Sequence, residues 1–482
     1  MGGCRAPVTA GSLQGHGAAL PARPRYSARA DCGNRNHAPC RCGQLPYHVP
    51  VTTQTSLPGY LPSWYAGSIG TPAPRPKLTH NHQADVVILG AGFTGLGAAI
   101  SLARQGLQVV VLEAERVGWG ASGRNGGQAL VGFGCDQQVL EGLAGQEHAR
   151  LLFDYSRQGL ALLKQRIAEF NIDCQWHDGA ADVAITARQA SGLQQQAERM
   201  ARLYDYPLQF WDHQRTRAEI DSPRFVAGLF DANAGHLHPL RYALGLARAA
   251  QQLGVRIYEH SPVRRISHPA RNKVSLHTDL AHVSADFAVI AGNALLQGIA
   301  PRLEKRIMPV GTYVGATPPL EPARARGLIA HDIAVADVNW ALDYFRLSAD
   351  HRLLFGGMAS YSALPPPGLQ AAMTRRMHTV FPQLRDVSLE QVWGGMIDIT
   401  RNRAPHFGRI GMNLYFAQGF SGHGVAATGL GGDLIARAIA GQSAGLDAFA
   451  RINHRPFPGG RLLRRPLLVA AMSWYKLRDR LG

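Results

Sequence analysis

The sequence predicts an α/β protein built on a parallel sheet, with an inserted α+β region that carries an antiparallel sheet. Three observations support this prediction. A short apolar strand, a glycine turn, a helix-period segment and a second apolar strand follow one another within residues 86–112, which is the pattern of a βαβ unit. A further strand, glycine loop and small-residue helix occupy residues 414–441. Residues 305–395 instead alternate in hydrophobicity, with a hairpin at 344–357, as antiparallel strands do.

The turn after the first strand reads GAGFTG (residues 90–95). Gly90 permits a sharp turn, Gly92 lets a pyrophosphate approach the backbone, and Gly95 lets the helix pack closely on the strands. The helix N-terminus then offers free N–H groups to phosphates. Glu113 follows the first glycine by 23 residues, close to the spacing of the acid that binds a ribose hydroxyl. Together these features predict a Rossmann-like dinucleotide-binding unit; the alternative is a glycine-rich turn of another α/β domain.

Two further glycine-rich segments have the composition of cofactor loops. Residues 118–128 (GWGASGRNGGQ) combine flexible backbone with a hydroxyl, an amide and a guanidinium group. Residues 419–424 (GFSGHG) precede a helix whose N-terminus would point at an electron-rich group. Cofactor-like segments thus recur in three separated parts of the chain, within 85–135, 255–292 and 393–441. Contacts that extensive suit a permanently held flavin dinucleotide better than a nicotinamide.

The net charge of +17 is concentrated at the two ends of the chain. Residues 1–84 and 451–482 each carry seven net positive charges, which leaves three for residues 85–450. The body is nearly neutral, so we expect no nucleic-acid partner.

Cysteine usage and hydropathy favour a cytoplasmic protein. Four of the six cysteines lie in the first 42 residues, and the body has only Cys135 and Cys174, which suits a reducing compartment. His37, Cys40 and Cys42 do not have the spacing of a recognised zinc site, and we predict no metal. No apolar run has the length of about 18 residues that a membrane span requires.

Composition and periodicity divide the chain into five parts. The N-terminal part is expected to be a disordered extension, or to be translated from upstream of the true start. The predicted parts are an extension (1–54), a Pro-rich arm anchored by Trp64 and Tyr65 (55–84), a discontinuous cofactor domain (85–135, 235–300 and 393–445), a substrate domain (136–234 and 301–392) and a basic C-terminal tail helix (446–482).

Five segments carry a resemblance to a known family. They are VVILGAGFTGLGAAI (86–100), VLEAERVGWGASGRNGGQ (111–128), GHLHPLRYALGLA (235–247), WGGMIDITRNRAPHFGR (393–409) and GFSGHGV (419–425). With these segments the chain resembles the D-amino-acid-oxidase-type (DAO) family of FAD-dependent oxidoreductases over about residues 55–482. Within that family it is most similar to the gamma-glutamylputrescine oxidase branch.

The resemblance implies a Rossmann-like FAD domain and a substrate domain whose sheet covers the reacting face of the flavin. It implies oxidation of an amine C–N bond, with hydride transfer to flavin N5, hydrolysis of the imine, and electrons passed to O2 to give H2O2. The implied substrate is a small amine such as gamma-glutamylputrescine. Two alternatives stay open: a D-amino-acid or sarcosine-type dehydrogenase that reduces a quinone, and a flavoprotein of a tRNA-modifying system.

The resemblance also assigns the residues that would hold FAD. They are Gly90, Gly92, Phe93, Thr94, Gly95, Glu113, Ala114, Ser122, Arg124, Asn125, Gly126, Gly127, Val263, Gly292, Gly422, His423 and Gly424. For His423 the alternative is a histidine at a helix start that is bonded to backbone. Some relatives tether their flavin through a late Cys or an early His. This chain has no Cys after Cys174 and no His in residues 86–128, which predicts noncovalent FAD.

Substrate contacts are expected from the antiparallel sheet. Tyr344 and Arg346 lie two positions apart on one strand and face the same side. Arg346 is expected to bind a carboxylate, and Tyr344 or Trp393 is expected to line the pocket beside the amine. The alternative is a cross-strand aromatic and a surface arginine. We assign no dedicated base, because the deprotonated amine is itself reactive. For the tail at 461–481, helix packing on the body is favoured over contact with a membrane surface.

Overall fold

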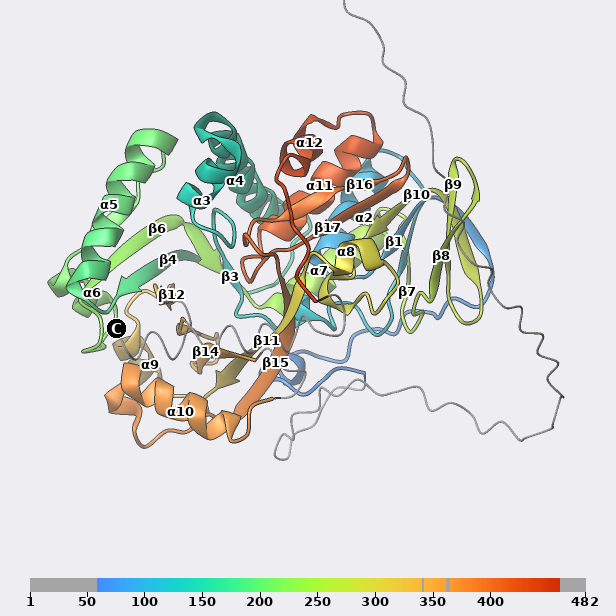
Figure 1. Cartoon of the computed structure of the whole chain (residues 1–482). Helices are drawn as coiled ribbons and strands as arrows, with labels where there is room; N and C mark the ends of the chain where they lie inside the picture. Colours follow the sequence, from blue (N-terminus) through green and yellow to red (C-terminus); the bar gives the residue numbers. More distant parts are fainter. Residues whose placement is uncertain (1–58, 340–341, 361–364, 460–482) are drawn as a thin grey trace, which may run out of the picture. The chain divides into compact units, whose positions relative to one another are not determined.

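The computed structural model describes residues 59–339, 342–360 and 365–459 (Figure 1). The predicted extension at 1–54, the His37, Cys40 and Cys42 group and the tail at 461–481 lie outside the described residues. Within the described ranges, the strands form one sheet of eight strands and one of nine, so the α/β fold with two sheets is confirmed. No helix in these ranges is long and apolar enough to cross a membrane.

The eight-stranded sheet has the order β16-β17-β10-β1-β2-β7, and a hairpin of β8 and β9 joins it at β10. The strands from β17 to β7 are parallel, while β16 is antiparallel to β17. All four residues of β2 are buried, as expected for a parallel strand covered on both faces. The strands are β1 (His82–Leu89), β2 (Val109–Leu112), β7 (Arg256–Tyr258), β8 (Arg265–Ala270), β9 (Lys273–His277), β10 (His282–Ile290), β16 (His406–Ile410) and β17 (Leu414–Gln418).

Small residues bring the helices beside this sheet close together. α11 packs against α2 and α4, and a Cβ on Gly432 of α11 would lie 2.5 Å from the backbone nitrogen of Ala98 in α2. Only glycine fits there, which explains the small-residue composition of α11. The helices are α2 (Phe93–Arg104), α4 (Gln146–Glu169), α7 (Pro239–Gln252), α8 (Pro301–Glu304), α11 (Ala427–Ile439) and α12 (Ala444–Ala450).

The nine-stranded sheet has the order β15-β11-β14-β13-β12-β4-β6-β3, and β5 pairs with β6. Its pairs are antiparallel as predicted, except that β4 and β12 run parallel. The strands are β3 (Gln128–Ala129), β4 (His177–Ala184), β5 (Gln209–Trp211), β6 (Ala227–His236), β11 (Met308–Ala316), β12 (Ala334–Asp337), β13 (Tyr344–Leu347), β14 (Leu353–Ser360) and β15 (Gln391–Ile399).

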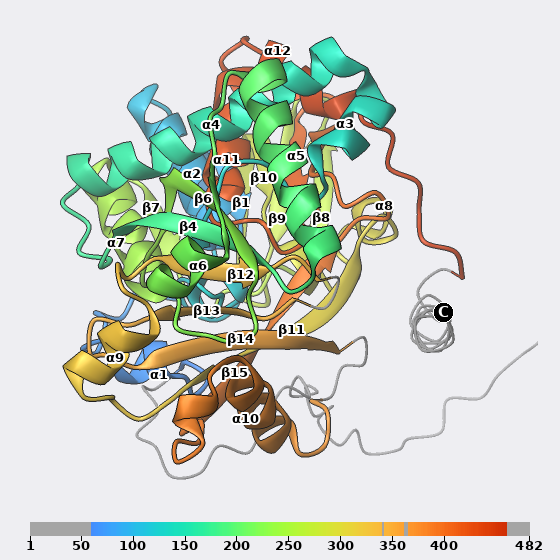
Figure 2. The ribbon, with the colours of Figure 1, turned by 90° about the vertical axis from the view of Figure 1, so that its left-hand side faces the viewer.

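One face of the nine-stranded sheet is closed by two helices. α9 and α10 lie on the same side of this sheet (Figure 1, Figure 2). Phe345, Phe355 and Val335 of the sheet share a buried core with Met373 and Met377 of α10. The remaining helices are α3 (Gln137–Ala144), α5 (Ala187–Tyr204), α6 (His213–Glu219), α9 (Pro322–Leu328), α10 (Leu369–Val380) and the short 3-10 turns η1 (Ala121–Gly123), η2 (Asn293–Leu295) and η3 (Pro382–Leu384).

The segment before β1 is anchored by aromatic side chains. It contains α1 (Trp64–Gly67), in which Trp64 and Tyr65 are buried as predicted. The Tyr65 ring meets Trp393 edge-on, with 5.1 Å between ring centroids, and also meets His238. The arm therefore supports residues of β15.

Strand β15 connects the two parts of the molecule. The sequence pattern places residues from 393 onward with the cofactor segments, yet β15 pairs with β11 in the nine-stranded sheet. Its side chains nevertheless face cofactor loops: Trp393 bonds to Arg124, and Ile397 lies beside Gly422. The strand belongs to the second sheet by its hydrogen bonds and to the cofactor site by its side chains.

Candidate flavin and substrate site

The turn between β1 and α2 leaves no room for side chains. Gly90 has φ +102°, and a Cβ there would lie 2.8 Å from the Ala291 carbonyl oxygen. A Cβ on Gly95 would collide with the Gly90 carbonyl oxygen. The chain therefore presents bare backbone where α2 begins. The N–H of Thr94 lies in the first turn of α2, where a pyrophosphate is expected.

The loop after β2 is fixed on this turn. The Ser122 hydroxyl accepts a hydrogen bond from the Phe93 N–H at 3.0 Å, directly beside Gly92. The Asn125 amide donates to the Ala121 and Ser122 carbonyls and accepts from the Gly127 N–H at 2.8 Å. The Ser122 and Asn125 side chains thus shape the loop, which leaves its main-chain groups to meet a cofactor.

Glu113 lies at the carboxyl end of β2, as the spacing predicts. Its carboxylate accepts hydrogen bonds from the Ala91 N–H at 2.7 Å and the Glu115 N–H at 3.0 Å. Burial raises the pKa of this carboxyl to about 7. Ala114 beside it is exposed, and the Ser261 N–H bonds to the Glu113 carbonyl. The bonds from the Ala91 and Glu115 N–H groups hold the Glu113 carboxylate at the edge of the sheet where a ribose is expected.

Val263 and Gly292 flank the first turn from other segments. Val263 is buried in a core shared with Val110 and Leu276. Gly292 follows β10 beside the Gly90 turn, and a Cβ on it would lie 2.8 Å from Leu89. Their role toward FAD remains a prediction.

The second glycine loop lies before α11, which begins at Ala427. Gly422 has φ +89°, a conformation that favours glycine. His423 Nε2 lies 3.1 Å from the Val131 carbonyl, to which it donates, and burial lowers its pKa. His423 is therefore a neutral histidine bonded to backbone, which is the alternative weighed above. Gly424 accepts a backbone bond from Thr428.

Asp398, within the segment 393–409, is a site residue that the sequence pattern did not single out. This buried carboxylate accepts hydrogen bonds from the Phe420 N–H at 3.2 Å and from the Gly419 N–H. Burial raises its pKa to about 7. An acid inside an apolar strand that precedes a glycine loop was the available signal. The Asp398 side chain thus fixes the second glycine loop by binding the loop's backbone N–H groups.

Tyr344 lies against the first cofactor loop. A Cβ on Gly126 would lie 2.6 Å from the Tyr344 ring, and the absence of a side chain at Gly356 on the neighbouring strand makes room for the same ring. Burial raises the pKa of the Tyr344 hydroxyl, so it is neutral at physiological pH. The structure thus brings the substrate sheet and the cofactor loop together at this tyrosine.

Arg346 has a different role from the one expected. It is buried and donates hydrogen bonds to the carbonyls of Gly126 (2.7 Å), Leu237 (2.9 Å) and Leu347 (3.0 Å) and to the Tyr65 hydroxyl (3.2 Å). These bonds leave no bidentate edge for a substrate carboxylate. Arg346 is neither a surface arginine nor a carboxylate ligand; it ties the 126–127 loop to the substrate sheet.

Trp393 is almost fully buried, and its Nε1 donates to the Arg124 carbonyl at 3.1 Å. The Arg124 guanidinium stacks on Trp119, 4.8 Å from the ring centroid. Trp393 therefore supports the loop at residues 118–128 through its bond to the Arg124 carbonyl.

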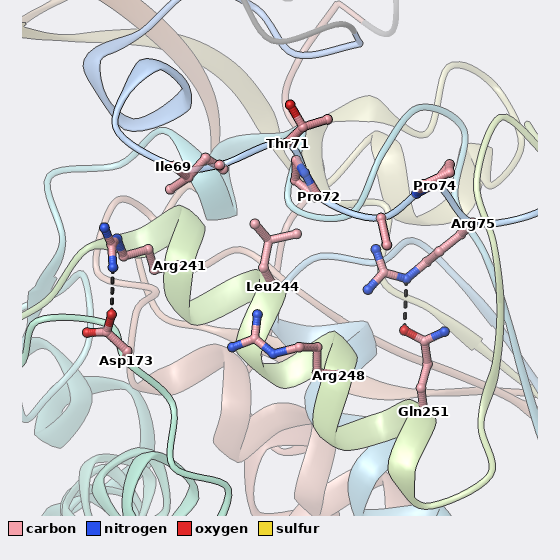
Figure 3. Close-up of a pocket in the computed structure, with 12 residues that line it drawn as sticks. Ile69, Thr71, Pro72, Pro74, Arg75, Asp173, Arg241, Leu244, Arg248 and Gln251 are labelled. Carbon is pink, nitrogen blue, oxygen red and sulfur yellow. Dashed lines mark hydrogen bonds and ion pairs between the residues drawn. The ribbon is translucent and has the colours of Figure 1, made fainter.

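A separate pocket of about 450 Å³ lies between the arm and α7 (Figure 3). Arg241 pairs with Asp173 at 2.6 Å, and Arg75 bonds to Gln251 at 3.0 Å. None of the predicted flavin or substrate residues lines it. Among the residues that the structure describes, no group of three or more His, Cys, Asp or Glu is arranged to hold a metal.

The residues present fit a dinucleotide flavin. The Gly90, Gly92 and Gly95 turn leaves backbone open for phosphates, Glu113 stands where a ribose diol would bind, and a second glycine loop supported by Asp398 precedes α11. These groups come from both ends of the sequence, as a cofactor spanning the sheet edge requires.

Comparisons with known proteins agree with this geometry. Residues 85–438 match the family described as DAO, FAD dependent oxidoreductase. Gamma-glutamylputrescine oxidoreductase of Escherichia coli (strain K12) is 41% identical over 421 residues, which cover 87% of this chain and 98% of that protein. The probable oxidoreductase OrdL of Haemophilus influenzae is 39% identical, with the same coverage. Glycine oxidase from Geobacillus kaustophilus has the same fold, with a TM-score of 0.67, 20% identity and coverage of 78% of this chain and 99% of that one. The chain belongs to the DAO family of FAD-dependent oxidoreductases and is an amine or amino-acid oxidoreductase of that type.

Proposed function

We propose that the protein oxidises an amine C–N bond of gamma-glutamylputrescine or a closely related amine. The observation that carries this proposal is the similarity to the E. coli gamma-glutamylputrescine oxidoreductase, which extends over 98% of that protein and therefore includes both sheets. The contact between Tyr344 and Gly126 supports it, because it sets the face of the substrate sheet against a predicted flavin loop.

The chemistry follows from what the side chains can do. When bound, the flavin supplies a hydride acceptor at N5. The chain would orient an amine in its deprotonated form beside Tyr344, whose raised pKa keeps the hydroxyl protonated and unable to act as a base. The oxidised product is an imine, which water hydrolyses. We assign no residue as a general base.

We propose O2 as the electron acceptor, with H2O2 as the product. A D-amino-acid or sarcosine-type dehydrogenase that reduces a quinone is the second candidate, favoured only if the basic C-terminal tail docks on a membrane. We propose a cytoplasmic location. A part in tRNA modification is disfavoured, because the body of the chain is nearly neutral. Failure of a variant lacking residues 1–54 to bind a heparin column would agree with this assignment.

We propose that FAD is bound noncovalently. No Cys follows Cys174, and burial raises the thiol pKa of both Cys135 and Cys174 to about 12. A thiol with so high a pKa supplies little of the thiolate that a tether would need. Acid precipitation should release all the yellow colour into the supernatant, and colour kept in the pellet would contradict the proposal.

Anaerobic titration tests the function directly. The purified protein should show flavin bands near roughly 375 and 450 nm. Gamma-glutamylputrescine should bleach these bands, and putrescine, sarcosine and D-amino acids should do so less readily. Colour that returns rapidly in air identifies an oxidase, and slow return that a quinone accelerates identifies a dehydrogenase. A flavin that no amine on the panel bleaches would overturn the proposed substrate.

A further inference from the structure

A continuous row of side chains crosses the nine-stranded sheet. Residues directly opposite one another on paired strands share a face of the sheet. Following the register from β15 to β4 gives the row Trp393, Val314, Gly356, Tyr344, Ala336 and Asp182. Asp182 therefore lies on the same face as Tyr344, two strands away, which is about 10 Å. Only the small side chain of Ala336 stands between them.

The two faces of these strands differ in exposure. The neighbouring residues Phe345, Val335 and Ala181 point to the opposite face and are buried in the core under α9 and α10. In the row, Tyr344 and Ala336 are partly exposed and Asp182 is exposed. The row is thus buried at Trp393, beside the cofactor loop, and becomes accessible to solvent from Tyr344 to Asp182.

Asp182 has no partner for its charge. Within the ranges that the structure describes, its carboxylate forms no ion pair and no hydrogen bond. Burial by the surrounding protein and the nearby carboxylates of Asp231, Asp136 and Asp337 raise its pKa to about 6. Asp231 differs, because the Tyr206 hydroxyl and the Asn233 N–H already donate to it. An exposed carboxylate that has no partner and lies near other carboxylates is stabilised in its charged form by a cation beside it.

We propose that Asp182 binds a second ammonium group of the substrate, far from the C–N bond that is oxidised. An ammonium group donates three hydrogen bonds and would satisfy this carboxylate and offset the three acids around it. The inference rests on the proposed function, since gamma-glutamylputrescine carries such an ammonium on its glutamyl end. It makes Asp182 a specificity residue for amines that carry a second ammonium group, with the row from Tyr344 to Asp182 as the path of the chain.

Binding to the reduced holoenzyme tests the inference without turnover. The probes are 1,8-diaminooctane and 1-aminooctane, which differ only in the second ammonium, and calorimetry gives their Kd. We expect the wild-type protein to bind the diamine at least about tenfold more tightly, and Asp182→Asn to remove that preference while leaving the monoamine unchanged. Asp178→Asn is the matched control, because Asp178 lies on the same strand, is exposed and is paired with Lys164.

The outcomes are distinct from those for the proposed function. Equal binding of the two probes by the wild-type protein, or an equal preference in Asp182→Asn and wild type, would overturn the role of Asp182. Loss of both probes in Asp182→Asn with normal flavin content would show a general effect and also overturn it. Bleaching of the oxidised flavin by gamma-glutamylputrescine, tested separately, decides the proposed function whichever result Asp182 gives.

Discussion

The two sides of the site are built by different means. On the cofactor side, Gly90, Gly92 and Gly95 contribute by lacking side chains, and backbone N–H groups are expected to bind the phosphates. On the substrate side, Tyr344 and Asp182 are proposed to act through their side chains, which strand register brings onto one face. The first kind of site is local in sequence, whereas the second depends on pairing between distant strands.

This difference predicts how each side responds to substitution. A backbone site tolerates no added atom, because the neighbouring atoms are themselves backbone and cannot move aside. A side-chain site keeps its fold when a polar atom is removed and loses selectivity instead. Arg346 is the exception that joins the two, since a residue of the substrate sheet holds a cofactor loop.

The largest effect is expected for Gly95→Ala. The added methyl group would collide with the Gly90 carbonyl and force α2 away from β1. We expect loss of nearly all bound flavin, and destabilisation by about 4 kcal/mol or more. Absorbance of the purified variant and urea denaturation measure both. Gly142→Ala in α3, where nothing lies within 4 Å, should keep its flavin and change stability by less than about 1 kcal/mol. Full flavin content in Gly95→Ala would contradict the backbone account.

Arg346→Lys should have the next largest effect. Lysine cannot reproduce the planar set of bonds to Gly126, Leu237 and Tyr65, so buried acceptors lose their donors. We expect a loss of about 2–4 kcal/mol in unfolding free energy and weaker retention of flavin. The exposed Arg409→Lys should stay within about 0.5 kcal/mol of wild type. A stable variant that loses only affinity for acidic substrates would restore Arg346 as a carboxylate ligand.

Asp398 gives a pH-dependent prediction on the cofactor side. Its pKa is raised to about 7 in the folded protein, so between about pH 4 and 7 the folded state keeps a proton that the unfolded state has lost. Stability should therefore fall as the pH rises through this window. Asp398→Asn cannot ionise, and its loss of stability between pH 5 and 8 should be smaller than that of wild type by about 1–3 kcal/mol. Glu113 contributes with the same sign in both proteins. Urea denaturation at pH 5 and pH 8 gives the unfolding free energy of each protein. An equal change in that free energy in Asp398→Asn and wild type would refute this role.

The smallest effect on stability is expected for Tyr344→Phe. The Tyr344 hydroxyl forms no hydrogen bond with the described residues, and the ring alone fills the space beside Gly126 and Gly356. We expect unchanged flavin content, stability within about 0.5 kcal/mol and a change confined to the KM for the amine. A large drop in stability would show that the hydroxyl is part of the core.

The sequence predicted the strands, turn and helix of the cofactor side well, because their signals are local. A strand, a glycine turn and a helix must be neighbours in the chain, so Gly90 to Glu113 could be placed before any pairing was known. The substrate side was predicted less well. Arg346 was given the wrong partner, since its acceptors come from residues 65, 126 and 237, and β15 was grouped with the segments that it contacts instead of the sheet that it joins. Asp182 could not be singled out without the register of β12 on β4.

The row from Tyr344 to Asp182 also sets the distance between the two ends of a bound amine. Neighbouring strands are spaced by about 4.8 Å, so an acid on this face can stand only at fixed distances from Tyr344. Ala336 marks the next shorter distance. Combining Asp182→Asn with Ala336→Asp would move the charge one strand closer and shorten the preferred diamine by about that spacing. Chain-length selectivity in this fold would then be a discrete property, redesigned by exchanging two side chains on an unchanged backbone.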